Sequence, residues 1–123
     1  AGKSVGVTRG AIEDMELSKI VPASADVKRF EDNNATVSAF VSGQVQAIAT
    51  GASVAGNLMA RNPQLGTEFK FVLKDSPNFI GVAKGEDKLR AKVNEIIAAA
   101  KASGEIDKMA VKWLGRPAGE LPN

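Results

Sequence analysis

Residues 3–14 read KSVGVTRGAIED, and this stretch decides how the chain begins to fold. A short apolar strand over residues 4–8 runs through Arg9 and Gly10 into a segment with helical spacing of its apolar side chains. Backbone N–H groups in the first turn of a helix have no partner within that helix. Gly10, which lacks a side chain, lets another group approach them closely. We therefore expect a corner that can hold an anion.

Strand and helix patterns alternate from this corner to about residue 61. The apolar spacing predicts helices at residues 12–20, 35–42 and 53–61, with Asn33 or Asn34 capping the second. It predicts further strands at residues 27–30 and 45–50. Right-handed crossovers between such units produce a parallel sheet with helices on its faces. The predicted fold class is therefore α/β.

The pattern changes after residue 66. Alternating apolar residues predict a half-buried strand at 69–73, and residues 79–83 read as another strand. Two amphipathic helices then follow, the first starting after Gly85 and the second ending at Gly115. Trp113 falls on the apolar face of the second helix, where we interpret it as a core residue.

The composition removes several classes of function. The 123 residues include neither Cys nor His, so disulfides, thiolate metal sites and the commonest general base are excluded. We expect no metal and no cofactor. Sixteen basic residues are interleaved with fourteen acidic ones, which is typical of a soluble surface and predicts no nucleic-acid partner. No apolar run is long enough to cross a bilayer, so we expect no membrane insertion.

Three stretches, taken in order, resemble a known family. They are GKSVGVTRG at residues 2–10, FEDNNATVSAFVSGQVQAIATG at 30–51 and FIGVAKGEDKLRAKVNEIIAAAKASGEIDKMAVKWLG at 79–115. Together they resemble the C-terminal half of a family 3 bacterial extracellular solute-binding protein, the amino-acid-binding type of ABC-importer receptor. The resemblance implies the periplasmic binding protein type II fold and a periplasmic or extracellular location.

The resemblance also implies how the chain is divided. Residues 2–76 would form the second solute-binding lobe, and residues 77–84 a crossover strand that returns toward the first lobe. Residues 85–115 would be helices that pack on the first lobe, and residues 116–123 a loose tail. The N-terminal half would be missing. We therefore expect exposed apolar faces that pair with the missing lobe or with a second copy of this chain, the latter by exchange of the C-terminal segment.

The implied ligand contacts lie at the two strand ends of the predicted lobe. Gly10 matches a family glycine beside the ligand carboxylate, but Ala11 and Ile12 stand where hydroxyl residues are usual. Gly51 stands where the family places an acid that pairs with the ligand ammonium, so either Glu13 supplies this charge or the ligand differs. The candidate ligand-binding residues are Arg9, Gly10, Ala11, Ile12, Glu13, Thr50 and Gly51.

Each candidate also has a purely structural interpretation. Glu13 and Asp14 are acids in a first helical turn, which the helix dipole alone explains. Arg9 can be a solvated loop residue, and Thr50 and Gly51 can belong to an ordinary turn.

The predicted function is capture of a small polar solute, an amino acid or a related compound, by lobe closure and its delivery to an ABC permease. Two alternatives from other classes remain. The same lobes serve in ligand-sensing regulatory domains, and some relatives of the fold are enzymes that work in the cleft. Glu13 is the one acid that we can place there, so we expect no enzyme.

Overall fold

A computed structural model describes residues 2–122 of the chain. The chain divides into two compact units, of which the first ends at Asp75 and the second begins at Ser76. We describe each unit by itself.

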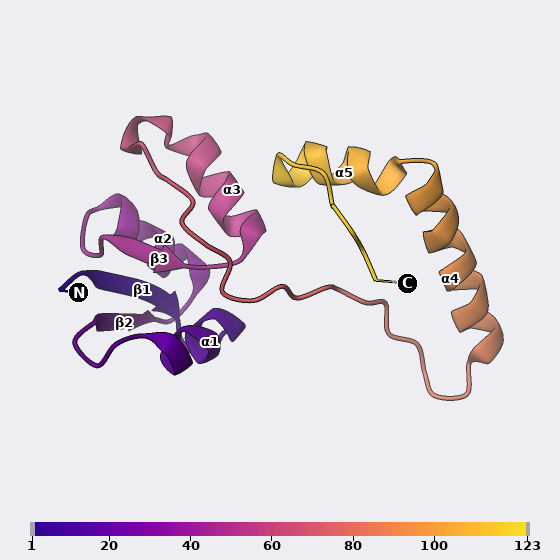
Figure 1. The fold of residues 1–123 in the computed structure, drawn as a ribbon, viewed down its shortest axis with the longest axis horizontal. Helices are drawn as coiled ribbons and strands as arrows, with labels where there is room; N and C mark the ends of the chain where they lie inside the picture. The colour runs from indigo at the N-terminus through magenta and orange to yellow at the C-terminus, as the bar shows by residue number, and fades with distance from the viewer. Residues whose placement is uncertain (1, 123) are drawn as a thin grey trace. The chain divides into compact units, whose positions relative to one another are not determined.

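The first unit is built on a parallel sheet of three strands, as Figure 1 shows. The strands are β1 (Ser4–Thr8), β2 (Asp26–Phe30) and β3 (Ala47–Ala49), in the spatial order β2-β1-β3. Val5 of the central strand lies opposite Val27 on one side and Ala47 on the other. The predicted α/β fold with a parallel sheet is confirmed.

Three helices connect or follow these strands. They are α1 (Ile12–Ile20), α2 (Asn33–Val41) and α3 (Ala52–Arg61), and the short 3-10 helix η1 (Pro63–Leu65) ends the series. The connection through α1 leads from β1 to one edge strand, and the connection through α2 leads back past β1 to the other edge. Right-handed crossovers in opposite directions place α1 and α2 on opposite faces of the sheet. The sheet is thus covered on both faces, and the core between these layers contains Val7, Leu17, Ala39, Val45 and Leu58.

Gly6 is required by the close packing around the central strand. A Cβ atom at this position would lie 3.1 Å from the ring of Phe30 and 3.1 Å from a methyl group of Val45. Both distances are shorter than ordinary van der Waals contacts, and packed interiors have little room to adjust. The sequence analysis did not single out this glycine.

Two details of the first unit differ from the prediction. Asp32, and neither Asn33 nor Asn34, is the N-cap of α2, because its carboxylate accepts a hydrogen bond of 2.8 Å from the Ala35 N–H. The third strand is shorter than residues 45–50, since the Val45 N–H bonds to the Ala39 carbonyl at the end of α2.

The predicted strands at residues 69–73 and 79–83 are wrong for this chain. Neither segment has strand structure, and Phe69, Phe71, Phe79 and Ile80 are exposed. A strand needs a neighbour that satisfies its backbone groups. The sheet of the described residues consists of β1, β2 and β3, so it offers these two segments no pairing.

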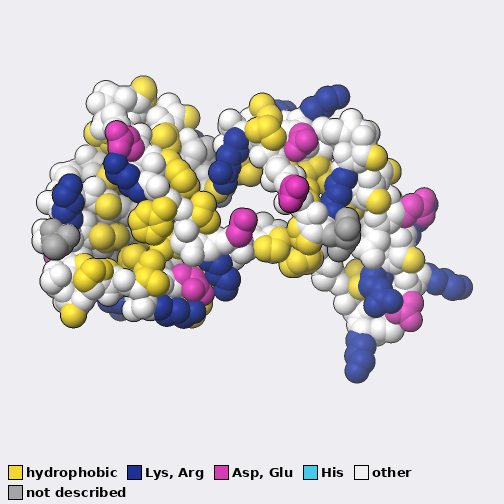
Figure 2. Space-filling model, in the orientation of Figure 1, with side chains coloured by type: hydrophobic (Ala, Val, Ile, Leu, Met, Phe, Trp, Pro, Cys, Tyr) yellow, Lys and Arg dark blue, Asp and Glu magenta, His cyan; other side chains and the backbone are white. Residues whose placement is uncertain are grey.

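The second unit contains the helices α4 (Asp87–Ala102) and α5 (Glu105–Leu114), which pack on each other. Gly104, at a φ of 77°, makes the turn between them. Within residues 76–122 the only buried apolar side chain is that of Ala110. Trp113 is 69% exposed, so its prediction as a core residue is wrong: its helix has no second apolar layer in this unit. Figure 2 shows apolar side chains at the surface of both units.

The predicted tail, residues 116–123, has no helix or strand up to residue 122, and residue 123 lies outside the described part. It is held at two points: the Ala118 N–H donates to Asp107 Oδ1 at 3.0 Å, and Lys101 Nζ donates to the Pro122 carbonyl oxygen at 2.5 Å. No helix within residues 2–122 has the length and apolar character needed to cross a bilayer.

Candidate functional site

The candidate residues follow the carboxyl ends of β1 and β3. These strands are neighbours in a parallel sheet, so the loops that leave them lie side by side. Binding sites of open parallel sheets typically form at this edge. The structure therefore brings the loop of residues 9–11 close to Thr50 and Gly51.

Gly10 makes the turn from β1 into α1. Its φ of 72° lies in the left-handed region, which favours glycine. Its N–H donates to Asp14 Oδ2 at 3.0 Å, and the Ala11 N–H donates to the Thr8 carbonyl at 3.1 Å. The first two backbone donors of the predicted anion corner are thus used inside the chain.

Asp14 is a buried anion that holds this turn in place. It is 7% exposed and also accepts hydrogen bonds from Arg29 Nε at 2.9 Å and from Ser18 Oγ at 3.3 Å. The backbone hydrogen bond from Gly10 lowers the pKa of Asp14 below its ordinary value, and the bond and charge of Arg29 add to this effect against the opposing effect of burial. The sequence reveals its first-turn position but gives no sign of the partner on β2.

Three backbone donors remain at the start of α1. The N–H groups of Ile12, Glu13 and Asp14 make no hydrogen bond within residues 2–122, and the N-cap Ala11 has no side-chain acceptor to offer them. Unpaired N–H groups and the positive end of the helix dipole favour an anion at such a terminus. A ligand carboxylate fits this chemistry without any hydroxyl side chain.

Glu13 lies beside Gly51. A Cβ atom built on Gly51 would be 3.5 Å from Glu13 Oε1, although the two residues belong to different strand-to-helix connections. The Glu13 side chain is half-buried, and its carboxylate makes no ion pair or hydrogen bond with any described residue. The structure thus places a carboxylate without a bonding partner among the described residues next to Gly51, where the resemblance leads one to expect an acid.

Arg9 and Thr50 differ in their surroundings. The guanidinium of Arg9 is exposed and lies 3.5 Å from a carboxylate oxygen of Glu31, which is also exposed. This pair agrees with the interpretation of Arg9 as a solvated residue. Thr50 is partly buried between β3 and α3, and its hydroxyl makes no hydrogen bond within the described part of the chain.

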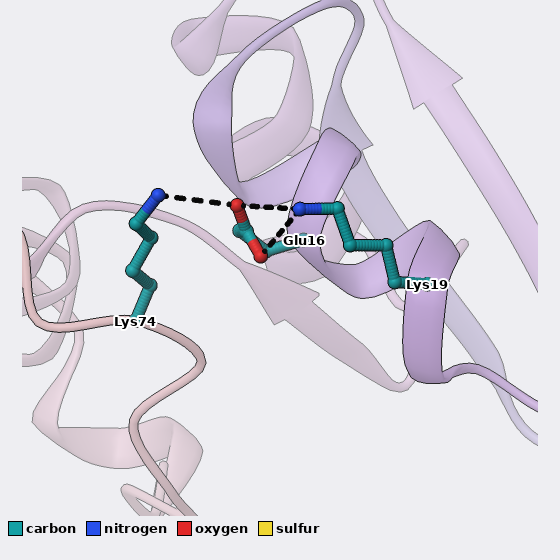
Figure 3. A network of polar contacts seen from close by, with 3 residues as sticks. All are labelled: Glu16, Lys19 and Lys74. Carbon is teal, nitrogen blue, oxygen red and sulfur yellow. Dashed lines mark hydrogen bonds and ion pairs between the residues drawn. The ribbon is translucent and has the colours of Figure 1, made fainter.

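Glu16 connects α1 to the last residues of the first unit, as Figure 3 shows. Its carboxylate accepts a hydrogen bond of 3.0 Å from Nζ of Lys19 on the same helix and one of 3.3 Å from Nζ of Lys74 in the segment after η1. The hydrogen bond from Lys19, followed by that from Lys74, lowers the pKa of Glu16. The two acids next to Glu13 on α1 therefore both have basic partners: Asp14 is bonded to Arg29, and Glu16 is bonded to Lys19 and Lys74.

A hollow of about 520 Å³ lies away from the candidate residues, beside the C-terminal end of α1 and β2. It is open to solvent, and its one guanidinium, that of Arg29, is already bonded to Asp14. Its lining residues are Ser18, Val21, Pro22, Ala23, Ala25, Asp26, Val27 and Arg29. None of the predicted site residues is among them. Residues 2–122 also hold no cluster of three or more acidic side chains that could bind a metal ion.

Comparison with known proteins gives consistent results. A probable histidine-binding protein of Neisseria gonorrhoeae is 24% identical over 119 residues, which are 94% of this chain and 44% of that protein. An ancestral arginine-binding protein, solved with arginine bound, is 31% identical with a TM-score of 0.70 over 93% of this chain and 51% of that one.

An ancestral amino acid-binding protein, described as a precursor of cyclohexadienyl dehydratase, shares the fold with a TM-score of 0.62. It is 24% identical, over 91% of this chain and 47% of its own. This chain thus spans about half the length of the relatives it matches. Residues 15–116 match the family described as bacterial extracellular solute-binding proteins, family 3. The chain belongs to this family.

Proposed function

We propose that this chain supplies one wall of the binding cleft of an amino-acid receptor that serves an ABC importer. Residues 2–76 form the solute-binding lobe, and the loops after β1 and β3 contact the ligand. The family membership and the amino-acid-binding relatives support this proposal. The protein acts by binding and carries out no chemistry on its ligand.

The observation that carries the proposal is the row of unpaired N–H groups at Ile12, Glu13 and Asp14. It lies at the start of α1, directly after the loop that follows β1, and it is chemically complementary to a carboxylate. Gly10 and Ala11 shape the turn, Glu13 and Gly51 border the same place, and Arg9 and Thr50 lie at its margin. Arginine, histidine and the other α-amino acids of proteins carry the carboxylate that this row requires.

The mechanism follows from a site divided between two lobes. A ligand first contacts one lobe, and a hinge motion then brings the other lobe over it, so that full affinity arises only in the closed state. The N-terminal lobe supplies the second wall, and the closed receptor passes its ligand to the ABC permease at the periplasmic or extracellular side. The chain alone makes about half of the contacts and therefore binds weakly.

The second unit provides the return to the N-terminal lobe. Residues 77–84 cross over, and residues 85–115 cover an apolar surface of that lobe. Ala110 is the single buried apolar residue within residues 76–122, which supports the need for such a partner. In preparations of the isolated chain a second copy takes this place.

An NMR titration of the ¹⁵N-labelled chain tests the proposed function. L-Arginine or L-histidine at millimolar concentration shifts the amide signals of residues 10–14 and 50–51, with a dissociation constant weaker than micromolar. Agmatine, which is arginine without its carboxylate, serves as the matched control and shifts the signals of residues 12–14 less than L-arginine does. Equal shifts with agmatine, or none with either amino acid, would refute a carboxylate site at this helix end.

A further inference from the structure

We propose that the Glu13 carboxylate binds the α-ammonium group of the ligand, and that the absent side chain at Gly51 leaves the space for this contact. The inference rests on the function proposed above. It assigns Glu13 as the residue that selects an amino acid with a free ammonium group over derivatives whose amine carries no charge.

Nothing in the fold imposes a glycine at position 51. Its φ of −65° and ψ of 151° are accessible to every residue, and an added Cβ would make only an ordinary contact, 3.5 Å from Glu13 Oε1. The residue is also the N-cap of α3, where Asp, Asn or Ser would bond to the first helical N–H groups and a glycine cannot. Gly51 is an acceptable N-cap residue without a capping side chain, and it leaves open space beside a carboxylate.

The carboxylate beside this space has no partner of its own. Asp14 is bonded to Arg29 and Gly10, and Glu16 is bonded to Lys19 and Lys74. Glu13 is half-buried on the same helix, and no described residue pairs with it. A partly desolvated carboxylate is more stable with a cation close by. The helix thus leaves one of its three neighbouring acids available for an external positive charge.

The position of this charge matches the chemistry of an α-amino acid. The ammonium and carboxylate groups of such a ligand are attached to one carbon atom, so their two binding groups must be close neighbours. The unpaired N–H groups of Ile12, Glu13 and Asp14 lie in the same helical turn as the Glu13 side chain. One ligand can therefore bind the N–H groups through its carboxylate and Glu13 through its ammonium group.

A structural role for Glu13 gives a different expectation. The carboxylate lies near the start of α3, whose dipole it can stabilise without any ligand. That role would affect the stability of the fold but would not make binding depend on the charge of a ligand amine. The test must therefore compare ligands as well as variants.

The test measures binding of L-arginine and N-acetyl-L-arginine, which has lost only the ammonium charge, through the amide shifts of residues 12 and 51. In the natural chain, acetylation raises the dissociation constant on the order of tenfold, as expected for a charged hydrogen bond. In Glu13→Gln, L-arginine binds as weakly as its acetyl derivative binds the natural chain, and acetylation has little further effect. Since the added acetyl group is equally bulky in both chains, the difference isolates the charge.

A relocated carboxylate provides the matched gain of function. Gly51→Asp in the Glu13→Gln background places an acid at the same point and restores the preference for L-arginine. Gly51→Asp in the natural chain instead brings two carboxylates together, and their repulsion opposes the stabilising N-cap that the new Asp provides to α3. If Glu13→Gln does not fold, Gly51→Lys is the substitute variant. Its ammonium group lies beside the natural Glu13, and it removes the preference for L-arginine over N-acetyl-L-arginine.

The outcomes separate the two proposals. If L-arginine binds at the start of α1 but acetylation has the same effect in the natural chain and in Glu13→Gln, the role of Glu13 is wrong and the carboxylate site stands. If neither ligand shifts the amides of residues 12–14, the proposed function itself fails.

Discussion

Two adjacent acids in one helical turn have different roles at the scale of single residues. Asp14 is buried, paired with Arg29 and bonded to the Gly10 N–H, so it fixes the turn that leads from β1 into α1. Glu13 has no partner in the described chain and lies at the edge of the candidate site. The helix dipole favours both, but only the tertiary contacts distinguish them. Asp14 is a positioning residue, and Glu13 is available to a ligand.

Replacement of Asp14 tests the positioning role. Asp14→Asn removes the charge that Arg29 neutralises, and we expect the free energy of unfolding of the first unit to fall by about 1–2 kcal/mol, because Arg29 retains some access to water. Glu13→Gln is the matched control in the same turn, with an expected loss below about 1 kcal/mol. Urea unfolding followed by circular dichroism measures both. Equal losses would show that Asp14 acts through the dipole alone.

The pKa of Asp14 predicts how stability depends on pH. Its pKa is lowered from the ordinary 3.8, so the native state holds this proton less tightly than the unfolded state. The contribution is therefore complete above the ordinary value and is lost as the pH falls through the lower native value. The difference in unfolding free energy between the natural chain and Asp14→Asn should shrink between about pH 7 and about pH 3. A difference that stays constant over this range would contradict the assignment.

At the scale of elements, the central strand sets the spacing of the sheet and its helices. Gly6 brings β1 close to Phe30 and Val45. The backbone angles of Gly51, in contrast, are accessible to any residue. We expect Gly6→Ala to reduce the unfolding free energy by about 1–3 kcal/mol through overpacking. Gly51→Ala should reduce it by less than about 1 kcal/mol, since it changes only a weak N-cap. Chemical denaturation of the two variants checks this order, and the reverse order would be incompatible with the packing described.

The sequence predicted the three strands of the sheet and the helices α1 to α5, including the two helices of the second unit. Residues 4–8 and 12–20 carry both the apolar period and the Gly10 signal, and the structure has a strand and a helix there. Apolar and polar residues also alternate at 69–73. Such alternation indicates that one face of the segment can be buried, but it does not show that a neighbouring strand is present. For the same reason the apolar face of α5 was recognised while the exposure of Trp113 was not.

The site was less accessible to sequence reasoning than the fold. The turn at Gly10 could be predicted because its conformation depends on local residues. The pairing of Asp14 with Arg29 and the proximity of Glu13 to Gly51 depend on how separate strand-to-helix connections pack, and neither has a local sequence signal. The spacing of residues along the chain therefore predicted the strand-to-helix turn at Gly10, but it did not predict which charged side chains lie close to one another there.

At the scale of the whole molecule, the two units differ in what they bury. The first has a core between its sheet and helices, whereas the second has one buried apolar residue in α5 and exposes Phe79, Ile80, Met109 and Trp113. Figure 2 shows apolar side chains at the surface of both units. A pair of helices with so small a core needs an apolar partner to be stable. We therefore expect the second unit to depend on an apolar partner more than the first.

Self-association of the isolated chain is the prediction at this scale. We expect light scattering to show dimers or larger species at high concentration, and Trp113→Ser to raise the dimer dissociation constant by about tenfold or more, as the loss of a large aromatic contact does. Lys108→Ser, an exposed change on the same helix, should have little effect. A clean monomer of the natural chain at high concentration would contradict the prediction.

The central claim is that backbone N–H groups at the start of α1 bind a ligand carboxylate. Ile12 is the first residue of α1, is 49% exposed and follows Ala11, whose φ of −70° and ψ of 163° suit a residue before proline. Ile12→Pro therefore deletes one N–H and keeps the helix, because proline is favoured at this position. Ile12→Ala removes the same side chain and retains the N–H.

The deciding measurement is the affinity of both variants for L-arginine by NMR titration. The account predicts that Ile12→Ala binds like the natural chain and that Ile12→Pro binds on the order of tenfold more weakly, which is the loss of one charge-assisted hydrogen bond. Equal affinities of the two variants would contradict it.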